Sequence, residues 1–209
     1  MPLKVGVLIS GSGTNLQSLI ESVDNGVVKA EISVVISNKE NAYGLVRARQ
    51  HNIDCVSINE KNFHNFEGFN DAIIEVFRTY KVDLVVLAGY IKMLSKKFIA
   101  EYRNKIINIH PSLIPSFCGK GYYGIKVHEA VIDYGVKVSG ATVHFVDEGA
   151  DTGPIILQEA VNVDSGDTAE TLQQKILKVE HRILPLAVKY FCENRIELVQ
   201  RKVIIKELN

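Results

Sequence analysis

The sequence lacks several features that would assign it to a specialised class of protein. Its 209 residues include only three cysteines, which are widely spaced, and neither a Cys-x-x-Cys pair nor a His-Glu-x-x-His motif occurs. This cysteine usage argues against a disulfide framework or a dedicated zinc site and favours a reducing cytoplasm. No apolar stretch is long enough to cross a bilayer, and the chain starts in a strand pattern rather than a signal peptide.

An excess of charge of one sign is also lacking. Lys plus Arg and Asp plus Glu each number 24, so the formal net charge is zero. A balanced charge gives no general electrostatic reason to bind nucleic acid or a membrane. The hydrophobic content of 46% is typical of a globular protein, and no linker, repeat or low-complexity segment interrupts it. We therefore predict a single domain over residues 1–209.

Strand and helix patterns alternate along the first half of the chain and predict a parallel α/β sheet. Strands are expected over 3–10, 32–36, 55–58, 82–88 and 106–110, and helices over 16–24, 43–51, 66–80 and 95–102. The second half predicts a helix over 125–134, strands over 138–146 and 155–163, a long helix over 167–192 and a β segment over 197–206. The expected fold is an open, mostly parallel twisted sheet flanked by helices, with antiparallel edge additions in the C-terminal half.

A polar pair closes the central predicted strand. Asn108 and His110 are two residues apart, so their side chains should share one face of the strand. Pro111 then removes a backbone donor and ends the regular structure. A rigid strand before an irregular loop is the usual setting for a catalytic pair. The alternative is a polar strand end that hydrogen-bonds to its own loop.

A glycine-rich loop, Gly11–Asn15, joins the first predicted strand to the first helix. Backbone amides exposed by glycines at a helix N-terminus bind phosphate. The dinucleotide fingerprint fails because its third glycine position is Leu16, and no Gly-Lys-Ser/Thr follows. Spacing alone therefore leaves phosphate binding and a ligand-free turn as equal alternatives.

Two further segments have both a structural and a functional interpretation. The acid-rich segment Asp147–Pro154 joins two predicted strands as a turn, yet one of its carboxylates could orient His110 and stabilise its imidazolium. The segment Gly89–Leu94 lies at the carboxyl end of a parallel strand, where ligands of such sheets bind. Ordinary core packing explains the second segment equally well.

The octapeptide Asn-Ile-His-Pro-Ser-Leu-Ile-Pro at 108–115 resembles the signature of the folate-dependent formyltransferases, and the resemblance extends from the glycine-rich loop to Glu180. It implies the Rossmann-like fold of that family and a catalytic trio of Asn108, His110 and Asp151. The resemblance also implies two groups of binding residues. They are Gly13, Thr14, Asn15 and Glu180 for the ribonucleotide substrate, and Ile91, Lys92, Met93, Leu94, Asn108, Val146, Asp147 and Glu148 for folate.

The activity implied by the resemblance is formyl transfer from 10-formyltetrahydrofolate to the amine of 5′-phosphoribosylglycinamide, a step of de novo purine biosynthesis. The N-terminal half would bind the phosphate and ribonucleotide, the C-terminal half the folate, with the site between them. Asn108 and a protonated His110, whose pKa Asp151 would raise, are expected to stabilise the oxyanion. We expect no metal, no nucleic-acid or membrane partner, a cytoplasmic location, and a monomer or homodimer.

Three alternatives share parts of this pattern. Hydrolysis of formyltetrahydrofolate would use the same trio, normally behind an N-terminal regulatory domain, for which the first strand leaves no room. Formylation of aminoacyl-tRNA would call for an additional domain and a basic surface. A non-catalytic nucleotide-binding module would leave the trio without a role.

The sequence departs from the family pattern at a few positions. Lys92 stands where arginine is common, the loop Gly119–Gly124 differs from that of many members, and no arginine lies near Phe66 on the phosphate side. Lys61 or backbone amides alone would then serve the phosphate. His144 is interpreted as structural or surface, although it lies near the site, and Cys118 lacks the local base signature of a nucleophile.

Overall fold

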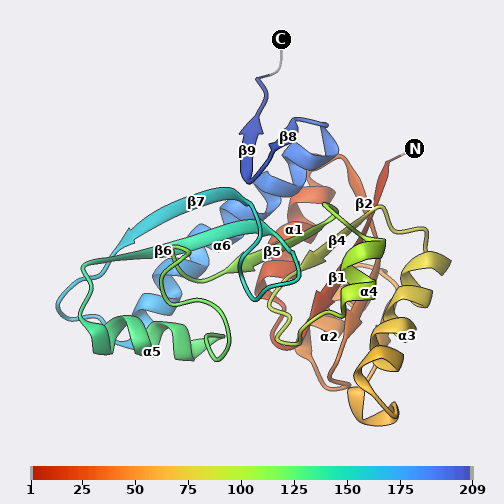
Figure 1. The fold of residues 1–209 in the computed structure, drawn as a ribbon, viewed down its shortest axis with the longest axis horizontal. Coiled ribbons are helices and arrows are strands. Elements are labelled where there is room, and N and C mark those ends of the chain that lie inside the picture. Colours follow the sequence, from red (N-terminus) through yellow and green to blue (C-terminus); the bar gives the residue numbers. More distant parts are fainter. Residues whose placement is uncertain (1, 208–209) are drawn as a thin grey trace. The chain divides into compact units, whose positions relative to one another are not determined.

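The computed structural model describes residues 2–207, and Figure 1 shows the helices and strands along the chain. The strands are β1 (Leu3–Ile9), β2 (Ala30–Ser37), β3 (Cys55–Ser57), β4 (Leu84–Leu87), β5 (Ile106–His110), β6 (Val138–Phe145), β7 (Ile155–Asn162), β8 (Ile196–Val199) and β9 (Lys202–Ile205). The helices are α1 (Thr14–Asp24), α2 (Tyr43–Gln50), the 3₁₀ turn η1 (Glu60–Asn62), α3 (Phe66–Thr79), α4 (Lys96–Glu101), α5 (Ile125–Tyr134) and α6 (Ala169–Cys192).

Seven strands form one sheet in the order β3-β2-β1-β4-β5-β6-β7, and β8 pairs with β9 in a separate two-stranded sheet. β1 pairs in parallel with β2 and β4, and β2 pairs in parallel with β3. β6 and β7 run antiparallel. The predicted fold class, a mostly parallel sheet with antiparallel strands towards the C-terminal end, is thereby confirmed.

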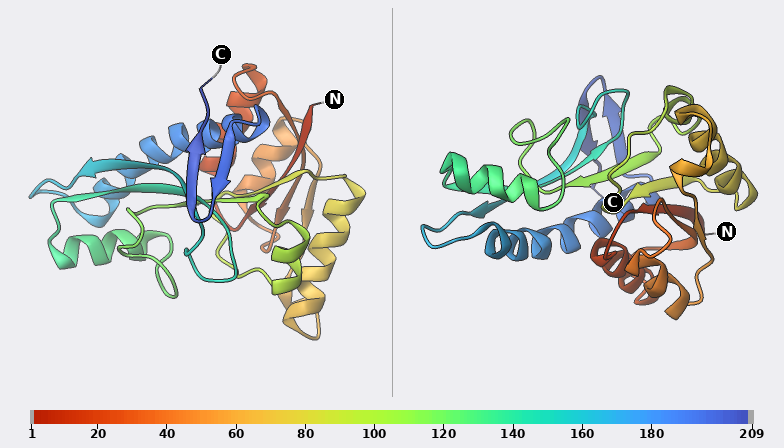
Figure 2. Two further views of the ribbon diagram at one scale, coloured as in Figure 1. Left: turned by 45° about the horizontal axis from the view of Figure 1, so that its top comes forward. Right: turned by 90° about the horizontal axis from the view of Figure 1, so that it is seen from below.

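The chain divides into two compact units between Ile107 and Asn108. In the first unit, α1 and α2 cover one face of the parallel strands and α3 and α4 cover the other (Figure 2). Because both faces are covered, β1 reads as a continuous apolar run, with Val5 and Val7 fully buried. Gly6 interrupts this run for a steric reason. A Cβ at Gly6 would lie 2.6 Å from the ring of Phe77, so the glycine lets α3 pack closely on β1.

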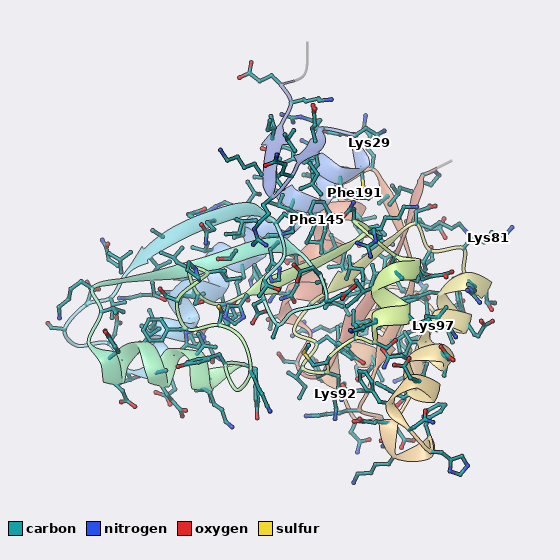
Figure 3. The ribbon with its side chains drawn as sticks, viewed as in Figure 1. Lys29, Lys81, Lys92, Lys97, Phe145 and Phe191 are labelled. Atoms are coloured by element: carbon teal, nitrogen blue, oxygen red, sulfur yellow. The ribbon has the colours of Figure 1, made fainter. Side chains whose placement is uncertain are left out.

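In the second unit, α5 packs against α6, and α6 runs along β6 and β7 (Figure 1). α6 begins with a reciprocal capping box, in which the side chains of Thr168 and Thr171 each accept from the other's backbone amide. Its last turn is fixed by Phe191, whose ring lies edge to face with Phe145 at 6.5 Å between centroids (Figure 3). The end of β6 is therefore held by α6.

The boundaries confirm most of the elements expected from the sequence. Ser95 is the N-cap of α4, and its hydroxyl accepts from the Phe98 amide. Two differences matter. α1 begins at Thr14 rather than at Leu16, because Gly13 in a left-handed conformation serves as its N-cap. The β segment expected at 197–206 is a hairpin, β8–β9. Within residues 2–207, no helix is long and apolar enough to cross a membrane.

Candidate active site

The glycine-rich loop is shaped by the close approach of α2. Gly13 has φ 71° and ψ 31°, and a Cβ placed on it would lie 2.6 Å from the Cα of Gly44. Glycine is therefore required at position 13 both by the left-handed backbone and by contact with α2. No side chain of the described residues caps α1 at this position. Thr14 and Asn15 form the first turn of α1, where backbone amides lack intrahelical partners.

A cation that the sequence did not single out touches this loop. Arg47, on α2, donates from Nε to the carbonyl of Ser12 at 2.9 Å and from Nη1 to Oε1 of Gln17 at 3.2 Å. The Gly44 amide also donates to the Gly11 carbonyl at 3.1 Å. The loop is thus anchored to α2 by its carbonyls. Sequence reasoning considered Lys61 and the segment around Phe66 as the source of a cation for the phosphate. It did not consider Arg47, because nothing in the pattern of α2 marks this residue as adjacent to the loop.

The segment after β4 is tied to the end of β1 and exposes apolar side chains. The Ile91 amide donates to the Ser10 hydroxyl at 3.0 Å. The side chains of Ile91 and Met93 are 44% and 52% exposed, while Leu94 is buried. Core packing, the structural alternative for this segment, therefore does not explain Ile91 or Met93. Lys92 forms an ion pair with Glu60 of η1, and its position in the structure is labelled in Figure 3.

The predicted catalytic trio comes together within the second unit. Nδ1 of His110 lies 3.6 Å from Oδ2 of Asp151. Nδ2 of Asn108 lies 3.0 Å from Nε2 of His144, and the same nitrogen of His144 is 3.6 Å from Oδ1 of Asp151. Asn108 and His110 thus reach one cluster from the end of β5, and Asp151 enters it from the loop between β6 and β7.

The charge state of His110 differs from the expectation drawn from the sequence. Its ring is 4% exposed, and burial lowers its pKa below the ordinary value, outweighing the opposing effects of Asp151 and the Phe117 carbonyl. The expectation of a raised pKa is therefore wrong, because it counted the carboxylate and not the desolvation. Nε2 of His110 lies 2.9 Å from the Phe117 carbonyl oxygen, so Nε2 carries the proton. In the neutral ring, Nδ1 then presents its lone pair on the side of Asp151.

Asp151 is held by backbone rather than by the imidazole. The amide of Gly119 donates to Oδ2 at 2.8 Å. Burial alone would raise the pKa of this carboxyl, but its contacts with His144, His110 and Gly119 outweigh burial and lower it. Asp151 has φ 57°, a left-handed conformation that is uncommon outside glycine. An ionised carboxylate on a strained turn, facing a neutral imidazole, is the kind of arrangement found at functional sites.

The loop that carries Asp151 is organised by its own side chains. Oδ1 of Asp147 accepts from the Gly149 amide and from the Thr152 hydroxyl. Arg201, at the turn of the β8–β9 hairpin, donates to the Thr152 carbonyl at 2.7 Å. Asp147 is therefore a turn-forming residue here, while Glu148 beside it is exposed and Val146 is half-buried.

The segment after β5 is anchored to the antiparallel strands. The hydroxyl of Thr142, in β6, donates to the Ser112 carbonyl at 2.6 Å and accepts from the Ile114 amide at 3.1 Å. Gln158, in β7, donates to the Ile114 carbonyl at 2.9 Å. These hydrogen bonds fix the path of the backbone after His110. They account for the position of the motif and do not assign its chemistry.

Burial decides how two remaining candidates from the sequence, Glu180 and Cys118, are interpreted. Glu180, on α6, is only 5% exposed, so it is not part of a solvated helical face as its sequence context alone indicated. Burial and the charge of Asp151 raise the pKa of the Cys118 thiol, which disfavours the thiolate and agrees with its rejection as a nucleophile. Within the part of the chain that the structure describes, no group of three or more His, Cys, Asp or Glu side chains could hold a metal ion.

His144 is a site residue to which the sequence assigned no chemical role, although it was expected to lie near the site. The residue is 1% exposed, and its ring contacts Asn108 and lies 3.6 Å from Asp151. The alternation of β6 alone could not reveal this, because Ala141 through Phe145 are all buried.

The chain resembles known proteins in both sequence and fold. A family model described as formyl transferase matches residues 3–188. The chain belongs to the formyl transferase family. A curated member, phosphoribosylglycinamide formyltransferase of Haemophilus influenzae, is 44% identical over 195 residues, which cover 93% of this chain and 90% of that protein. The crystal structure of glycinamide ribonucleotide transformylase 1 from Symbiobacterium toebii superposes with a TM-score of 0.94 and 43% identity, covering 99% of this chain and 95% of that one.

A third similar protein is named for a different reaction. The crystal structure of a formyltetrahydrofolate deformylase from Pseudomonas syringae pv. tomato has a TM-score of 0.89 at 27% identity, covering 99% of this chain and 67% of that one. The family fold therefore does not by itself separate formyl transfer from hydrolysis. Identity is higher to the two proteins named as transferases.

Proposed function

We propose that this chain transfers the formyl group of 10-formyltetrahydrofolate to the amine of 5′-phosphoribosylglycinamide, in de novo purine biosynthesis. The observation that carries the proposal is the convergence of Asn108, His110 and Asp151 in one cluster. The names and identity of the relatives support this choice of donor and acceptor. The chemistry needs a donor to the formyl oxygen and a group that accepts a proton, and this cluster contains both.

In the first step, the neutral amine of the ribonucleotide attacks the formyl carbon. A carbon–nitrogen bond forms while the carbonyl electron pair moves onto oxygen, giving a tetrahedral oxyanion. The side-chain amide of Asn108 and the Nε2–H of His110 donate hydrogen bonds to that oxygen. The Nε2–H of His110 donates to the Phe117 carbonyl, so in the reaction it would exchange that acceptor for the oxyanion.

In the second step, the attacking nitrogen must lose a proton and the departing folate N10 must gain one. Nδ1 of neutral His110 has a lone pair on the side of Asp151, so it accepts the proton of the attacking nitrogen through water, and the carboxylate stabilises the resulting imidazolium. The proton then passes to N10 through water as the bond from carbon to N10 breaks and the carbonyl re-forms. Neutral His110 at rest suits this role better than the imidazolium expected from the sequence.

Each unit contributes its own candidate binding residues. In the first unit, Gly13, Thr14 and Asn15 would bind the substrate phosphate through helix N-terminal amides, while Ile91, Met93 and Leu94 would provide an apolar wall for folate with Lys92 as its cation. In the second unit, Val146, Asp147 and Glu148 would line the folate site beside Asn108, and Glu180 would contact the ribonucleotide.

Acceptor choice is the decisive experiment. Release of tetrahydrofolate is followed spectroscopically with 5′-phosphoribosylglycinamide, with charged initiator tRNA, and with water alone. The expected result is rapid release only with the ribonucleotide, accompanied by the formylated product. Equal release without an amine acceptor would instead indicate a deformylase, the alternative that the Pseudomonas syringae structure keeps open.

A further inference from the structure

His144 is buried in the cluster without a role in the steps described above. Its Nδ1 lies 2.7 Å from the carbonyl oxygen of Phe145, the next residue in the chain. Its Nε2 lies 3.0 Å from Nδ2 of Asn108. The ring therefore connects the end of its own strand, β6, to the functional amide at the end of β5.

The first of these contacts determines the tautomer of His144. A carbonyl oxygen can only accept, so the proton of a neutral ring must sit on Nδ1. Nε2 then carries a lone pair and can only accept. Oδ1 of Asp151 lies 3.6 Å from Nε2, beyond hydrogen-bond distance, whereas Nδ2 of Asn108 lies at 3.0 Å, so Asn108 is the hydrogen-bond partner of this nitrogen.

The tautomer in turn determines the orientation of the Asn108 amide. The two ends of an asparagine amide are distinguished by their hydrogen-bond partners, because the nitrogen donates and the oxygen accepts. A lone pair on Nε2 of His144 selects the amide nitrogen of Asn108 as its partner. The opposite orientation would place the amide oxygen against that lone pair, with no proton between them.

We propose that His144 is a positioning residue that fixes the Asn108 amide so that its nitrogen, and hence its second N–H, remains the donor in the catalytic cluster. This inference rests on the proposed function for its catalytic consequence, but the orientation itself does not. The Phe145 carbonyl sets the His144 tautomer, the tautomer sets the Asn108 amide, and the amide presents an N–H to the developing oxyanion. Burial of His144 excludes water that would otherwise satisfy either orientation.

Two substitutions at position 144 separate the two contacts of the ring. His144→Asn supplies an amide near the former Nδ1 and can still donate to the Phe145 carbonyl, but it is too short to accept from Asn108. His144→Gln can place its carbonyl oxygen near the former Nε2, which restores the acceptor for Asn108. His64→Asn, an exposed histidine far from β6 in the sequence, is the matched control.

We expect kcat of His144→Asn to fall by roughly 10²–10³, the scale for loss of one oxyanion donor, with KM for the ribonucleotide nearly unchanged. His144→Gln should recover kcat to within about tenfold of the parent, on the same scale. Equal losses in the Asn and Gln variants, or a near-normal kcat in His144→Asn, would overturn the catalytic part.

A measurement on the unmodified protein tests the orientation without substrate. In ¹⁵N-labelled chain at neutral pH, Nε2 of His144 should give the chemical shift of an unprotonated ring nitrogen and show scalar coupling across the hydrogen bond to Nδ2 of Asn108. A protonated Nε2 would overturn the inference. Because this readout needs neither donor nor acceptor, failure of the proposed function would appear separately, as absence of formyl transfer in the parent enzyme.

Discussion

Nδ1 of His110 and Oδ2 of Asp151 face each other at 3.6 Å, slightly too far apart for a hydrogen bond. The same carboxylate oxygen accepts from the Gly119 amide at 2.8 Å. The Gly119 amide therefore holds the ionised carboxylate in place while Nδ1 of His110 is still unprotonated. The pair is poised to stabilise an imidazolium that forms during the reaction.

Replacing Asp151 by Asn tests this relationship. The substitution removes the charge that opposes the burial of His110, so the already lowered pKa of His110 should fall further. Without the carboxylate, proton acceptance by Nδ1 loses its electrostatic support, and kcat should fall by roughly 10²–10⁴. KM for the ribonucleotide should change little. NMR titration of His110 gives the pKa, and steady-state kinetics gives the rate. Asp133→Asn, an exposed change on α5, should alter neither.

The pH dependence of the rate distinguishes a neutral from a protonated His110. If the neutral ring is the active form, kcat should stay level from about pH 7 upwards and fall in acid as His110 takes up a proton, because its pKa lies below the unperturbed value of about 6.5. A kcat that rises as the pH is lowered through this range would mean that the imidazolium is required. The profile should be recorded with both substrates saturating.

Alanine substitutions at two glycines of the same loop should differ sharply in their effect on the stability of the protein. A methyl group on Gly13 would lie 2.6 Å from the Cα of Gly44, on a backbone with φ 71°, whereas a methyl group on Gly11 would meet nothing within 4 Å. Gly13→Ala should lower the free energy of unfolding by about 2–4 kcal/mol through overpacking and strain, and raise KM for the ribonucleotide. Gly11→Ala should lower it by less than about 1 kcal/mol. Urea titrations of the two variants make the comparison, and equal stabilities would contradict the close approach of α2.

His128 should make the protein sensitive to acid. It is 2% exposed, and Nδ1 has no hydrogen-bond partner within residues 2–207. Burial lowers its pKa to about 4, below the value of about 6.5 in an unfolded chain. The unfolded state therefore binds more protons between these two pH values. Stability should be greatest above pH 6.5 and be lost as the pH falls towards 4, by up to about 2–3 kcal/mol from this residue.

The matched variant for this prediction is His128→Asn, which removes the titrating ring. The quantity to compare is the change in unfolding free energy between pH 7.5 and pH 4.5, measured for each protein by denaturant titration. The parent should lose more stability over this range than the variant. Equal losses would mean that His128 is protonated in the folded chain at no cost.

Lys92 and Lys97 test whether the segment after β4 binds the donor. Both form exposed ion pairs in the first unit, with Glu60 and Asp71 respectively, and Figure 3 labels both lysines. Each change to Met should alter the unfolding free energy by less than about 1 kcal/mol, since exposed pairs contribute little. Only Lys92→Met should raise KM for 10-formyltetrahydrofolate several-fold. An equal effect of the two variants would remove Lys92 from the folate site.

The sequence by itself determined most of the elements and predicted the trio. Continuous apolar runs and helical periodicity marked the parallel half, and the motif at Asn108 and His110 resembled one family closely. The helices predicted to start near Ser95 and Thr168 are capped in the structure by local hydrogen bonds that need no distant partner. These features depend on neighbours in the chain, so the sequence was sufficient to predict them.

Only the tertiary structure decided the charge state of His110, the role of His144 and the reason for Gly13. The pKa of His110 depends on how much water its neighbours exclude, which no motif records. His144 acts through Asn108, a residue on another strand, and Gly13 is required because α2 approaches it. In each case a contact with a part of the chain distant in sequence is needed, so it is the packing that determines the chemistry.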